Sequence, residues 1–281
     1  MKPRVMILVI FTAFVGMVLA PVNIEPLTSF YILLSITLGA GSSAAFNMWF
    51  DRDIDQEMER TKKRPIPMGI ISPNEAVLFG FFTGISSLAL MIVVSNYLAT
   101  MLLLFTILFY IVIYTFWLKR TTSLNIVIGG AAGAIPPIIG WTSVAPEISF
   151  LPISLFLIIF FWTPPHFWAL SVYRFNDYEK VKVPMLPNVS SIEDTKKQII
   201  YYTLILVILS YAPYLTLQVG FFYVVFASVL NIVLLIGSFK LKNSKEITGN
   251  KNKEGLKFFG LTIVYLFALF TGLLIDNVLI L

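Results

Sequence analysis

The sequence predicts an all-α integral membrane protein built as a bundle of nine transmembrane helices. Of its 281 residues, 58% are hydrophobic and only 12% are charged, and the mean hydropathy is +0.86. A soluble domain with a polar surface has no use for so much apolar surface. Cysteine is absent, which excludes disulfides, thiolate nucleophiles and cysteine-ligated metals. Any metal must therefore be held by oxygen ligands or by the single histidine.

Nine apolar segments are long enough to cross a bilayer, which takes roughly 17 to 25 residues each. Charged residues and Pro/Gly punctuation mark their ends. The first is short and has the features of a signal peptide, but Pro21, directly after the small residues, argues against cleavage. The segments cover approximately residues 5–20, 27–46, 76–95, 97–118, 124–141, 149–170, 199–217, 219–239 and 257–279.

The charges predict the orientation of these spans. With the N-terminus inside, the inside segments are the N-terminal tail, 47–75, 119–123, 171–198 and 240–256. They hold 2, 5, 2, 5 and 5 Lys and Arg residues, and Lys257 at the start of the last span completes the 20 in the chain. The other side receives only Glu25, Glu147 and Asp276. This positive-inside pattern predicts a multi-pass plasma-membrane protein with a cytoplasmic N-terminus and an outside C-terminus.

The net charge of +5 follows from the same pattern. We interpret it as orientation and attraction to anionic membrane lipid, and we expect no nucleic-acid partner. Only four residues precede the first span, which leaves no room for an organellar transit peptide. We therefore expect a prokaryotic cytoplasmic membrane.

The inside segment that follows the second span carries an unusual density of charge, with five acidic and five basic side chains in residues 47–67. Asn47, Asp51 and Asp55 are spaced four residues apart, so on a helix they line one stripe, while Asp53 falls on the other side. Oxygen ligands suit Mg²⁺, and the basic residues that follow suit phosphate. The alternative is a solvent-exposed loop whose charges form salt bridges and have no binding function. Asn47 and Asp51, however, lie at the membrane boundary, where carboxylates are usually functional.

Two further inside segments repeat this theme. Residues 114–125 carry Lys119 and Arg120 at the end of the fourth span. Residues 171–189 supply Arg174, Asp177, Lys180 and Lys182 just past the sixth. Three such segments on one side of the membrane can meet over one cavity. Taken singly, basic residues at an inside helix end are the ordinary orientation signal.

The charged segment resembles the first aspartate-rich motif, NxxxDxxxD, of the UbiA-type intramembrane prenyltransferases. Its form NMWFDRDIDQEMERTKKRP is typical of the protoheme IX farnesyltransferase (haem O synthase) subfamily. Three later segments resemble that subfamily in the same order: LKRTTSLNIVIGGAAGAIPPIIGW (118–141), WTPPHFWAL (162–170) and DYEKVKVPMLPNV (177–189). The resemblance covers residues 47–189 densely, whereas the last three spans match only in hydropathy and number.

The resemblance implies helices around a central cavity that opens near the cytoplasmic face, with two acidic motifs facing each other there. It makes the whole chain, 1–281, a single polytopic domain with active-site loops at about 47–75 and 171–198. Members bind Mg²⁺ and an isoprenyl diphosphate. In this subfamily farnesyl diphosphate alkylates a vinyl group of haem B, and water addition gives haem O. Haem A synthase or terminal oxidase assembly are the downstream partners that this reaction implies.

The resemblance also assigns roles to residues. Asn47, Asp51, Asp55 and Asp177 are the implied catalytic residues, and Asp51, Asp55 and Asp177 hold Mg²⁺ through the diphosphate. Arg60, Arg64 and Lys119 are the implied diphosphate-binding residues. Many relatives in the wider superfamily carry a second acid four residues after the position of Asp177. Val181 stands there in this chain, as in the haem subfamily, which leaves a second metal ion undetermined.

His166 is the only histidine and lies near the inside end of the sixth span. If the helix continues, His166, Tyr173 and Asp177 share one face. One interpretation makes His166, with Tyr173 nearby, a haem-binding residue and an axial ligand of the iron. The other makes it a packed histidine bonded to a carbonyl freed where Pro164 and Pro165 interrupt the helix.

Residues 129–137, GGAAGAIPP, favour close helix packing over space cleared for a macrocycle or a prenyl tail.

Three other functions stay open on the residues alone. A transporter would more typically place polar residues near the bilayer midplane in repeated halves. A UbiA-type enzyme acting on a quinone precursor or a lipid would share the metal site and differ in its acceptor pocket. A haem assembly factor would not need Asp51 or Asp55.

Overall fold

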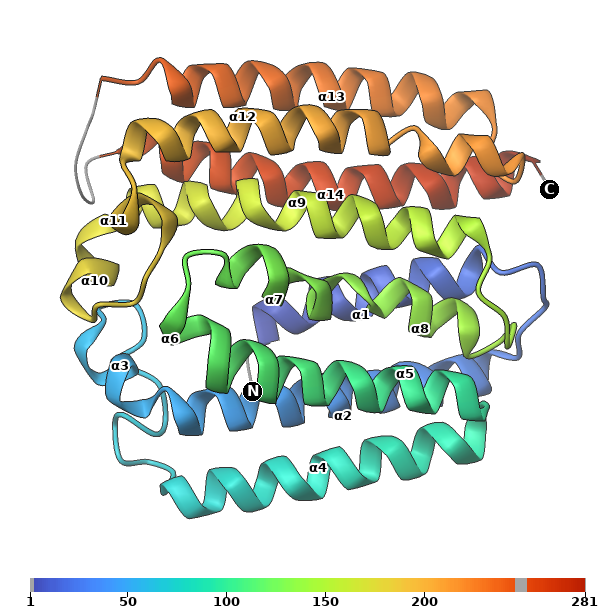
Figure 1. The fold of residues 1–281 in the computed structure, drawn as a ribbon. Coiled ribbons are helices and arrows are strands. Elements are labelled where there is room, and N and C mark those ends of the chain that lie inside the picture. The colour runs from blue at the N-terminus through green and yellow to red at the C-terminus, as the bar shows by residue number, and fades with distance from the viewer. Residues whose placement is uncertain (1–2, 246–251, 281) are drawn as a thin grey trace. The chain divides into compact units, whose positions relative to one another are not determined.

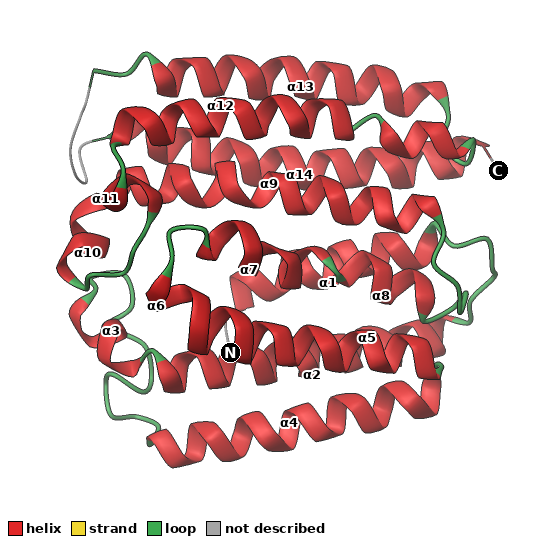
Figure 2. Ribbon diagram, viewed as in Figure 1, coloured by secondary structure: helices red, strands yellow, loops and turns green. Residues whose placement is uncertain are grey.

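The chain folds into α-helices in the computed structural model, which describes residues 3–245 and 252–280 (Figure 1). Helices and connecting turns account for all of the described residues, and none forms a strand (Figure 2). Among them, eight helical segments are long and apolar enough to cross a membrane, and a ninth, Val5–Val18, is apolar but shorter. The all-α fold is thus confirmed, and each predicted span corresponds to a helix. The predicted central cavity stays a prediction.

The observed boundaries differ from the predicted ones at two places that matter for function. The second helix runs to Phe50, so Asn47 lies in a helix and not in a loop. The seventh begins at Ile192 and not near residue 199, so the predicted inside loop 171–198 is too long. Charged residues in the first two turns of that helix lower its hydropathy, so the apolar segment begins later in the sequence than the helix does. Lys2 and residues 246–251 of the predicted inside segments lie outside the described residues.

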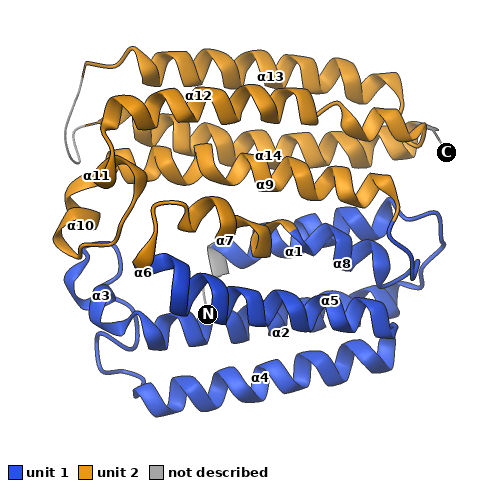
Figure 3. Cartoon of the chain, viewed as in Figure 1, with its two compact units in different colours: residues 1–120, 135–148 blue, residues 121–134, 149–281 orange. Residues whose placement is uncertain are grey.

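The described chain divides into two compact units (Figure 3). Unit 1 comprises residues 1–120 and 135–148. In it α2 packs along α4, and α1 packs along α8. Its helices are α1 (Pro3–Val18), α2 (Pro26–Phe50), α3 (Arg52–Glu57), α4 (Pro73–Val94), α5 (Tyr97–Leu108), the π-helix η1 (Phe109–Leu118) and α8 (Pro136–Thr142).

Unit 2 comprises residues 121–134 and 149–281, and α6 (Lys119–Thr121) spans the boundary between the units. In unit 2, α9 packs against α7, α12 and α14, and α13 packs against α12 and α14. The helices are α7 (Asn125–Ala134), α9 (Phe150–Tyr173), α10 (Phe175–Lys180), α11 (Leu186–Val189), α12 (Ile192–Leu209), the 3₁₀-helix η2 (Ala212–Thr216), α13 (Phe221–Lys242) and α14 (Lys253–Ile280). The single-domain prediction for 1–281 stays a prediction.

Polar residues fix several helix ends. Ser72 caps α4 by accepting a hydrogen bond from the Glu75 amide (3.2 Å), and the Glu75 carboxylate accepts one from the Ser72 amide (2.7 Å). This reciprocal capping box satisfies two amides that the first turn leaves unpaired. In unit 2, Asp276 is 1% exposed and accepts hydrogen bonds from the Gly220 and Tyr223 amides at the start of α13. Asp276 is therefore a helix cap.

Glycines allow backbones to approach closely where α1 crosses α8. A Cβ added to Gly140 would lie 1.9 Å from the Ala13 carbonyl oxygen, and one added to Gly16 would lie 2.1 Å from that of Pro137. In unit 2 a Cβ on Gly130 would meet Thr163 at 2.9 Å. Close packing is thus confirmed for Gly130 in the 129–137 segment, whereas Gly133 has nothing within 4 Å of an added Cβ.

We predict that Gly140→Ala lowers the stability of the protein by about 3 kcal/mol, because a backbone carbonyl must move to admit the methyl group. The measurement is the thermal midpoint of the detergent-solubilised protein. Gly260→Ala is the matched control, since a Cβ there meets nothing within 4 Å and alanine favours a helix. Equal midpoints for the two variants would contradict the close approach of α1 and α8.

Candidate functional site

The predicted polar stripe forms where α2 ends. The Asp51 amide bonds to the Asn47 carbonyl (3.0 Å), and the Asp55 amide bonds to the Asp51 carbonyl (2.8 Å). The four-residue periodicity therefore continues across the short break between α2 and α3 and keeps Asn47, Asp51 and Asp55 in register. Their exposed fractions are 2%, 0% and 2%. All three side chains of the stripe are therefore buried.

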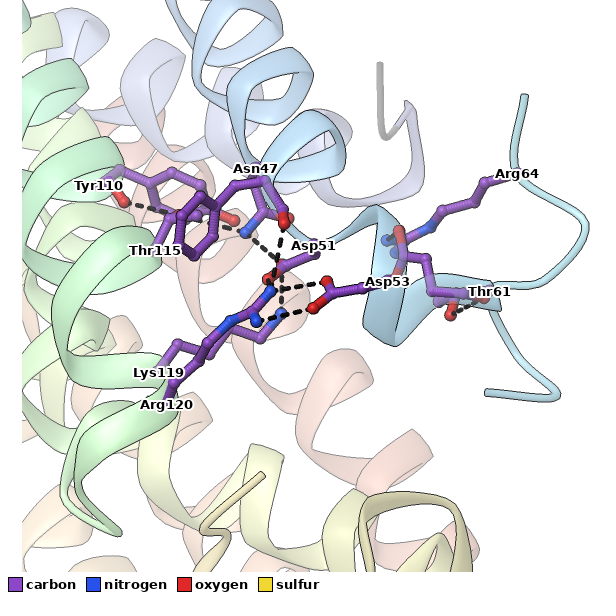
Figure 4. Close-up of polar contacts among 11 residues, drawn as sticks. Asn47, Asp51, Asp53, Thr61, Arg64, Tyr110, Thr115, Lys119 and Arg120 are labelled. Atoms are coloured by element: carbon purple, nitrogen blue, oxygen red, sulfur yellow. Dashed lines mark hydrogen bonds and ion pairs between the residues drawn. The ribbon is translucent and has the colours of Figure 1, made fainter. Parts of the chain in front are cut away.

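Two helices orient the amide of Asn47. Its Nδ2 donates to Asp51 Oδ2 (2.9 Å) and to Thr115 Oγ1 (3.1 Å), as Figure 4 shows. Thr115 lies in η1, and its hydroxyl donates to the Tyr110 carbonyl five residues earlier (2.9 Å). Because a π-helix holds more residues per turn than an α-helix, η1 changes the direction in which the side chains after it point. Lys119 and Arg120 are the residues that follow.

Both of these cations approach the acidic stripe. Lys119 Nζ forms an ion pair with Asp51 Oδ2, and Arg120 Nη2 lies 3.7 Å from Asp51 Oδ1. Both Nη atoms of Arg120 also donate to the Asp53 carboxylate oxygens at 2.8 Å. Forked contacts of this kind fix a guanidinium more firmly than a single bond does. The Arg120 guanidinium lies 4.7 Å from the centre of the Phe50 ring. Figure 4 shows the four charged side chains converging.

Asp55 has a cation of its own. Arg64 Nη1 lies 2.6 Å from Asp55 Oδ2, and the Thr61 hydroxyl donates to the Asp55 carbonyl at 3.2 Å. The segment after α3 therefore folds back over the end of the stripe. Arg60, the other predicted diphosphate ligand, is exposed and forms no ion pair with a residue that the structure describes.

Asp53 behaves differently from the buried acids. Its side chain is 61% exposed, and the hydrogen bonds from Arg120 hold its pKa below the ordinary value of 3.8. A lowered pKa makes the ionised form part of the folded state, so its contribution to stability is present above the ordinary value and is lost as the pH falls through the lowered one. Solvent screening keeps that contribution small.

The second acidic segment belongs to unit 2. Asp177 in α10 is 8% exposed, and Arg174 Nη1 lies 3.5 Å from its Oδ2. The Tyr173 ring packs against the same guanidinium, with 4.9 Å between the ring centre and Arg174 Cζ. Helix α9 ends at Tyr173, with Arg174 as its C-cap. The predicted continuous face of His166, Tyr173 and Asp177 is therefore wrong, because Asp177 follows on a separate helix.

Asn125, which the sequence reasoning did not select, holds the chain that follows Asp177. It is 0% exposed, and its Nδ2 donates to the Thr122 carbonyl (2.6 Å) and to the Pro184 carbonyl (3.2 Å). The first bond is local and the second joins the start of α7 to the segment after α10. Nothing in the sequence pattern distinguishes this asparagine from an ordinary helix-capping residue.

His166 packs as a sandwich between two aromatic rings inside unit 2. Trp162 stacks on one side at 4.2 Å and 17°, and Phe259 on the other at 4.4 Å and 23°. Its Nδ1 lies 2.8 Å from Thr262 Oγ1, on α14. The interpretation of His166 as a packed histidine is confirmed, but its side-chain hydrogen-bond partner is the Thr262 hydroxyl and not a carbonyl freed by Pro164 and Pro165.

The hydroxyl of Thr262 lies within hydrogen-bond distance of two groups, His166 Nδ1 (2.8 Å) and the Phe259 carbonyl (2.7 Å). When the hydroxyl donates to the carbonyl, it accepts from Nδ1. In that arrangement Nε2 keeps its lone pair. A hydrogen bond at one ring nitrogen is what orients a histidine whose other nitrogen binds a metal.

The donor atoms of both acidic segments fit a hard cation. Asp51 Oδ1 and Asp177 Oδ2 are buried and accept no hydrogen bond, and carboxylate oxygens are the ligands that Mg²⁺ prefers. Among the described residues, no group of three or more acidic or histidine side chains lies close enough to hold a metal by itself. The residues present therefore fit a metal that completes its coordination with water and substrate oxygens.

The structure thus assembles part of the predicted site and adds to it. It brings Asn47, Asp51 and Lys119 together and pairs Asp55 with Arg64, while Arg60 stands apart. Sequence reasoning did not assign a role to Arg120 or select Thr115, Asn125 and Thr262. Only Arg120 had a signal, since it adjoins Lys119 at the end of a span.

Comparisons with known proteins place this arrangement in a family. The chain is 48% identical to protoheme IX farnesyltransferase 2 of Mesorhizobium japonicum (99% of this chain, 88% of that protein) and to protoheme IX farnesyltransferase of Bartonella tribocorum (99% and 89%).

Solved structures share the fold. An apo UbiA homolog from Aeropyrum pernix has a TM-score of 0.76, with 98% of this chain and 99% of that chain covered at 18% identity. A UbiA homolog from Archaeoglobus fulgidus bound to GPP and Mg²⁺ has a TM-score of 0.66, with 96% of each chain covered at 17% identity. The profile of the UbiA prenyltransferase family matches residues 9–263. The chain belongs to the UbiA prenyltransferase family.

Proposed function

We propose that this protein transfers the farnesyl group of farnesyl diphosphate to a vinyl group of protoheme IX, with Mg²⁺ as its metal. The observation that carries the choice of substrates is the 48% identity, over nearly the full chain, to proteins named protoheme IX farnesyltransferase. The site in unit 1 supports the same reaction class, because buried carboxylates and convergent cations suit a metal-bound diphosphate.

The cations of unit 1 are the diphosphate ligands in this proposal. Lys119 and Arg120 are held against Asp51, and Arg64 is held against Asp55. A bound diphosphate would give these cations phosphate oxygens as partners, and its metal would give the carboxylates a cation. Each charged group would then exchange one opposite charge for another, so no charge would be left unpaired at the membrane boundary. The arginines bind phosphate as forks and the lysine as a point charge.

The metal supplies Lewis-acid stabilisation of the diphosphate oxygens when it is bound. In unit 1, Asp51 and Asp55 would hold it, and Asp177 is the candidate donor in unit 2. Asn47 keeps the Asp51 carboxylate in position through Nδ2, and Thr115 keeps Asn47 in position. The solved structure of a UbiA homolog bound to GPP and Mg²⁺ supports this assignment at the level of the fold.

The residues of the chain stabilise charge where the reaction develops it. The C1–O bond of farnesyl diphosphate breaks, and its electron pair leaves with the diphosphate, whose growing charge Lys119, Arg120 and Arg64 offset. The terminal vinyl carbon of the haem then bonds to C1. Water adds to the new cation beside the porphyrin ring and loses a proton, which leaves a hydroxyl group.

The haem side of the reaction involves unit 2. Nδ1 of His166 is engaged with the Thr262 hydroxyl, which makes Nε2 the nitrogen that would bind the haem iron. A bond from Nε2 to the iron would orient the macrocycle, and the iron would take no part in the bonds that form and break. The protein lies in the plasma membrane with its charged segments inside, and haem A synthase or a terminal oxidase takes up the product.

The experiment that tests the function incubates the purified protein in liposomes with haem B, farnesyl diphosphate and Mg²⁺, with and without EDTA. The expected result is a haem mass that grows by one farnesyl group and the hydroxyl of one water, only when the metal is present. Consumption of farnesyl diphosphate with a quinone precursor and none with haem would reject the haem assignment and keep the family.

The buried acids are expected to be essential. Asp51→Asn and Asp55→Asn should each lower farnesyl transfer by about 100-fold or more, because each removes a charge that the metal and the diphosphate require. Initial rates at saturating substrate check this. Asp53→Asn is the matched control in the same motif, and its exposed carboxylate predicts a loss below about tenfold. Near-normal rates in the first two variants would sink the metal-site assignment.

Thr262 is expected to act through His166 and not on the substrate. Thr262→Val keeps the shape of the side chain and removes the hydroxyl, so haem affinity should fall about tenfold, as when an outer-shell partner of a metal ligand is lost. A shifted haem absorption band should accompany the loss. Thr262→Ser keeps the hydroxyl and should restore both affinity and spectrum. Unchanged binding in the valine variant would remove His166 from the haem site.

A further inference from the structure

A groove runs between α13 and α14 within unit 2, and none of its lining residues has a role in the site described above. Its volume is about 940 Å³. Its walls are apolar along most of their length, with Val233 and Ile236 on α13 and Phe258 and Leu261 on α14. Ile236 is 50% exposed, whereas Phe258 is 2% exposed. The groove therefore has a buried floor and an open side.

The length of the groove matches one leaflet of a bilayer. On α13 the lining residues run from Val233 to Asn243, a rise of about 15 Å at about 1.5 Å per residue. Half of a hydrocarbon core of about 30 Å is also about 15 Å. Because Asn243 and Lys240 belong to the predicted inside segment 240–256, the groove would extend from the inner membrane surface towards the midplane.

The mouth of the groove is basic. Lys240 lies in the last turn of α13 and forms no hydrogen bond or ion pair with a residue that the structure describes. Lys257 lies opposite on α14, 70% exposed, with its Nζ 2.6 Å from Glu254 Oε1. Glu254 is the one acid among the lining residues. Basic side chains between helices at an inner membrane surface are typical of sites for anionic lipid headgroups.

We propose that this groove binds one anionic phospholipid, with an acyl chain along the apolar walls and the headgroup phosphate at Lys240 and Lys257. A prenyl diphosphate shares the same general chemistry, but it would need carboxylates to hold its metal. Glu254 is already paired with Lys257, so the groove offers no carboxylate stripe of the kind that Asp51 and Asp55 form. A singly charged phosphodiester suits two lysines and one paired acid better.

The test compares lipid retention by native mass spectrometry after the detergent-solubilised protein is titrated with phosphatidylglycerol or phosphatidylcholine of equal chain length. Lys240→Gln should weaken phosphatidylglycerol binding about fivefold, which corresponds to about 1 kcal/mol for one basic residue near an anionic surface. Lys242→Gln is the matched control, because Lys242 is an exposed lysine of the same helix turn that does not line the groove. Phosphatidylcholine binding should not distinguish the variants.

A second pair of variants tests the acyl-chain contacts. Ile236→Trp fills the groove and should displace the bound phosphatidylglycerol. Ile232→Trp, at a 59% exposed position of the same helix that is not part of the lining, should retain it. Equal lipid retention by Lys240→Gln and Lys242→Gln would overturn the proposal. So would displacement of the lipid by farnesyl diphosphate, which would make the groove a substrate site.

Discussion

The buried charge of Asp51 is the constraint on which the arrangement of unit 1 depends. An ion removed from water costs several kcal/mol unless partners replace its hydration, and Asp51 is 0% exposed. Its carboxylate partners come from two places in the chain: Asn47 one turn earlier, and Lys119 and Arg120 after η1. One buried carboxylate therefore ties the end of α2 to the residues that follow η1, while the Asp55 amide donates to the Asp51 backbone carbonyl at the start of α3.

The same constraint explains why the site can be stable without substrate and reactive with it. Each buried acid of the stripe has a cation, and Arg120 is further held by Asp53 and by the Phe50 ring. In the proposed reaction, a metal-bound diphosphate would replace these pairs by equivalent ones, so the protein would not have to create a new binding site for the negative charges of the diphosphate at the edge of the membrane. Preorganised charges of this kind stabilise a leaving group with little rearrangement.

The sequence predicted the parts of this protein that follow from local periodicity. Hydropathy located the spans, because each lipid-facing helix must be apolar along its length, and a four-residue spacing located the stripe of Asn47, Asp51 and Asp55. The start of α12 was misplaced because its first turns are charged. The partners of Arg120 and His166 were out of reach, since they lie 67 and 96 residues away in the chain. The π-helix η1 brings Arg120 to Asp53, and the contact between α9 and α14 brings His166 to Thr262.

In the proposed mechanism, the cations paired with Asp51 and Asp55 pass to the diphosphate. An experimental structure of the protein with Mg²⁺ and a non-cleavable farnesyl diphosphate analogue tests this most directly. We expect Lys119, Arg120 and Arg64 to contact phosphate oxygens, and the Asp51 and Asp55 carboxylates to face the metal or its water ligands. A diphosphate bound elsewhere, with the Asp51–Lys119 and Asp55–Arg64 pairs intact, would contradict it.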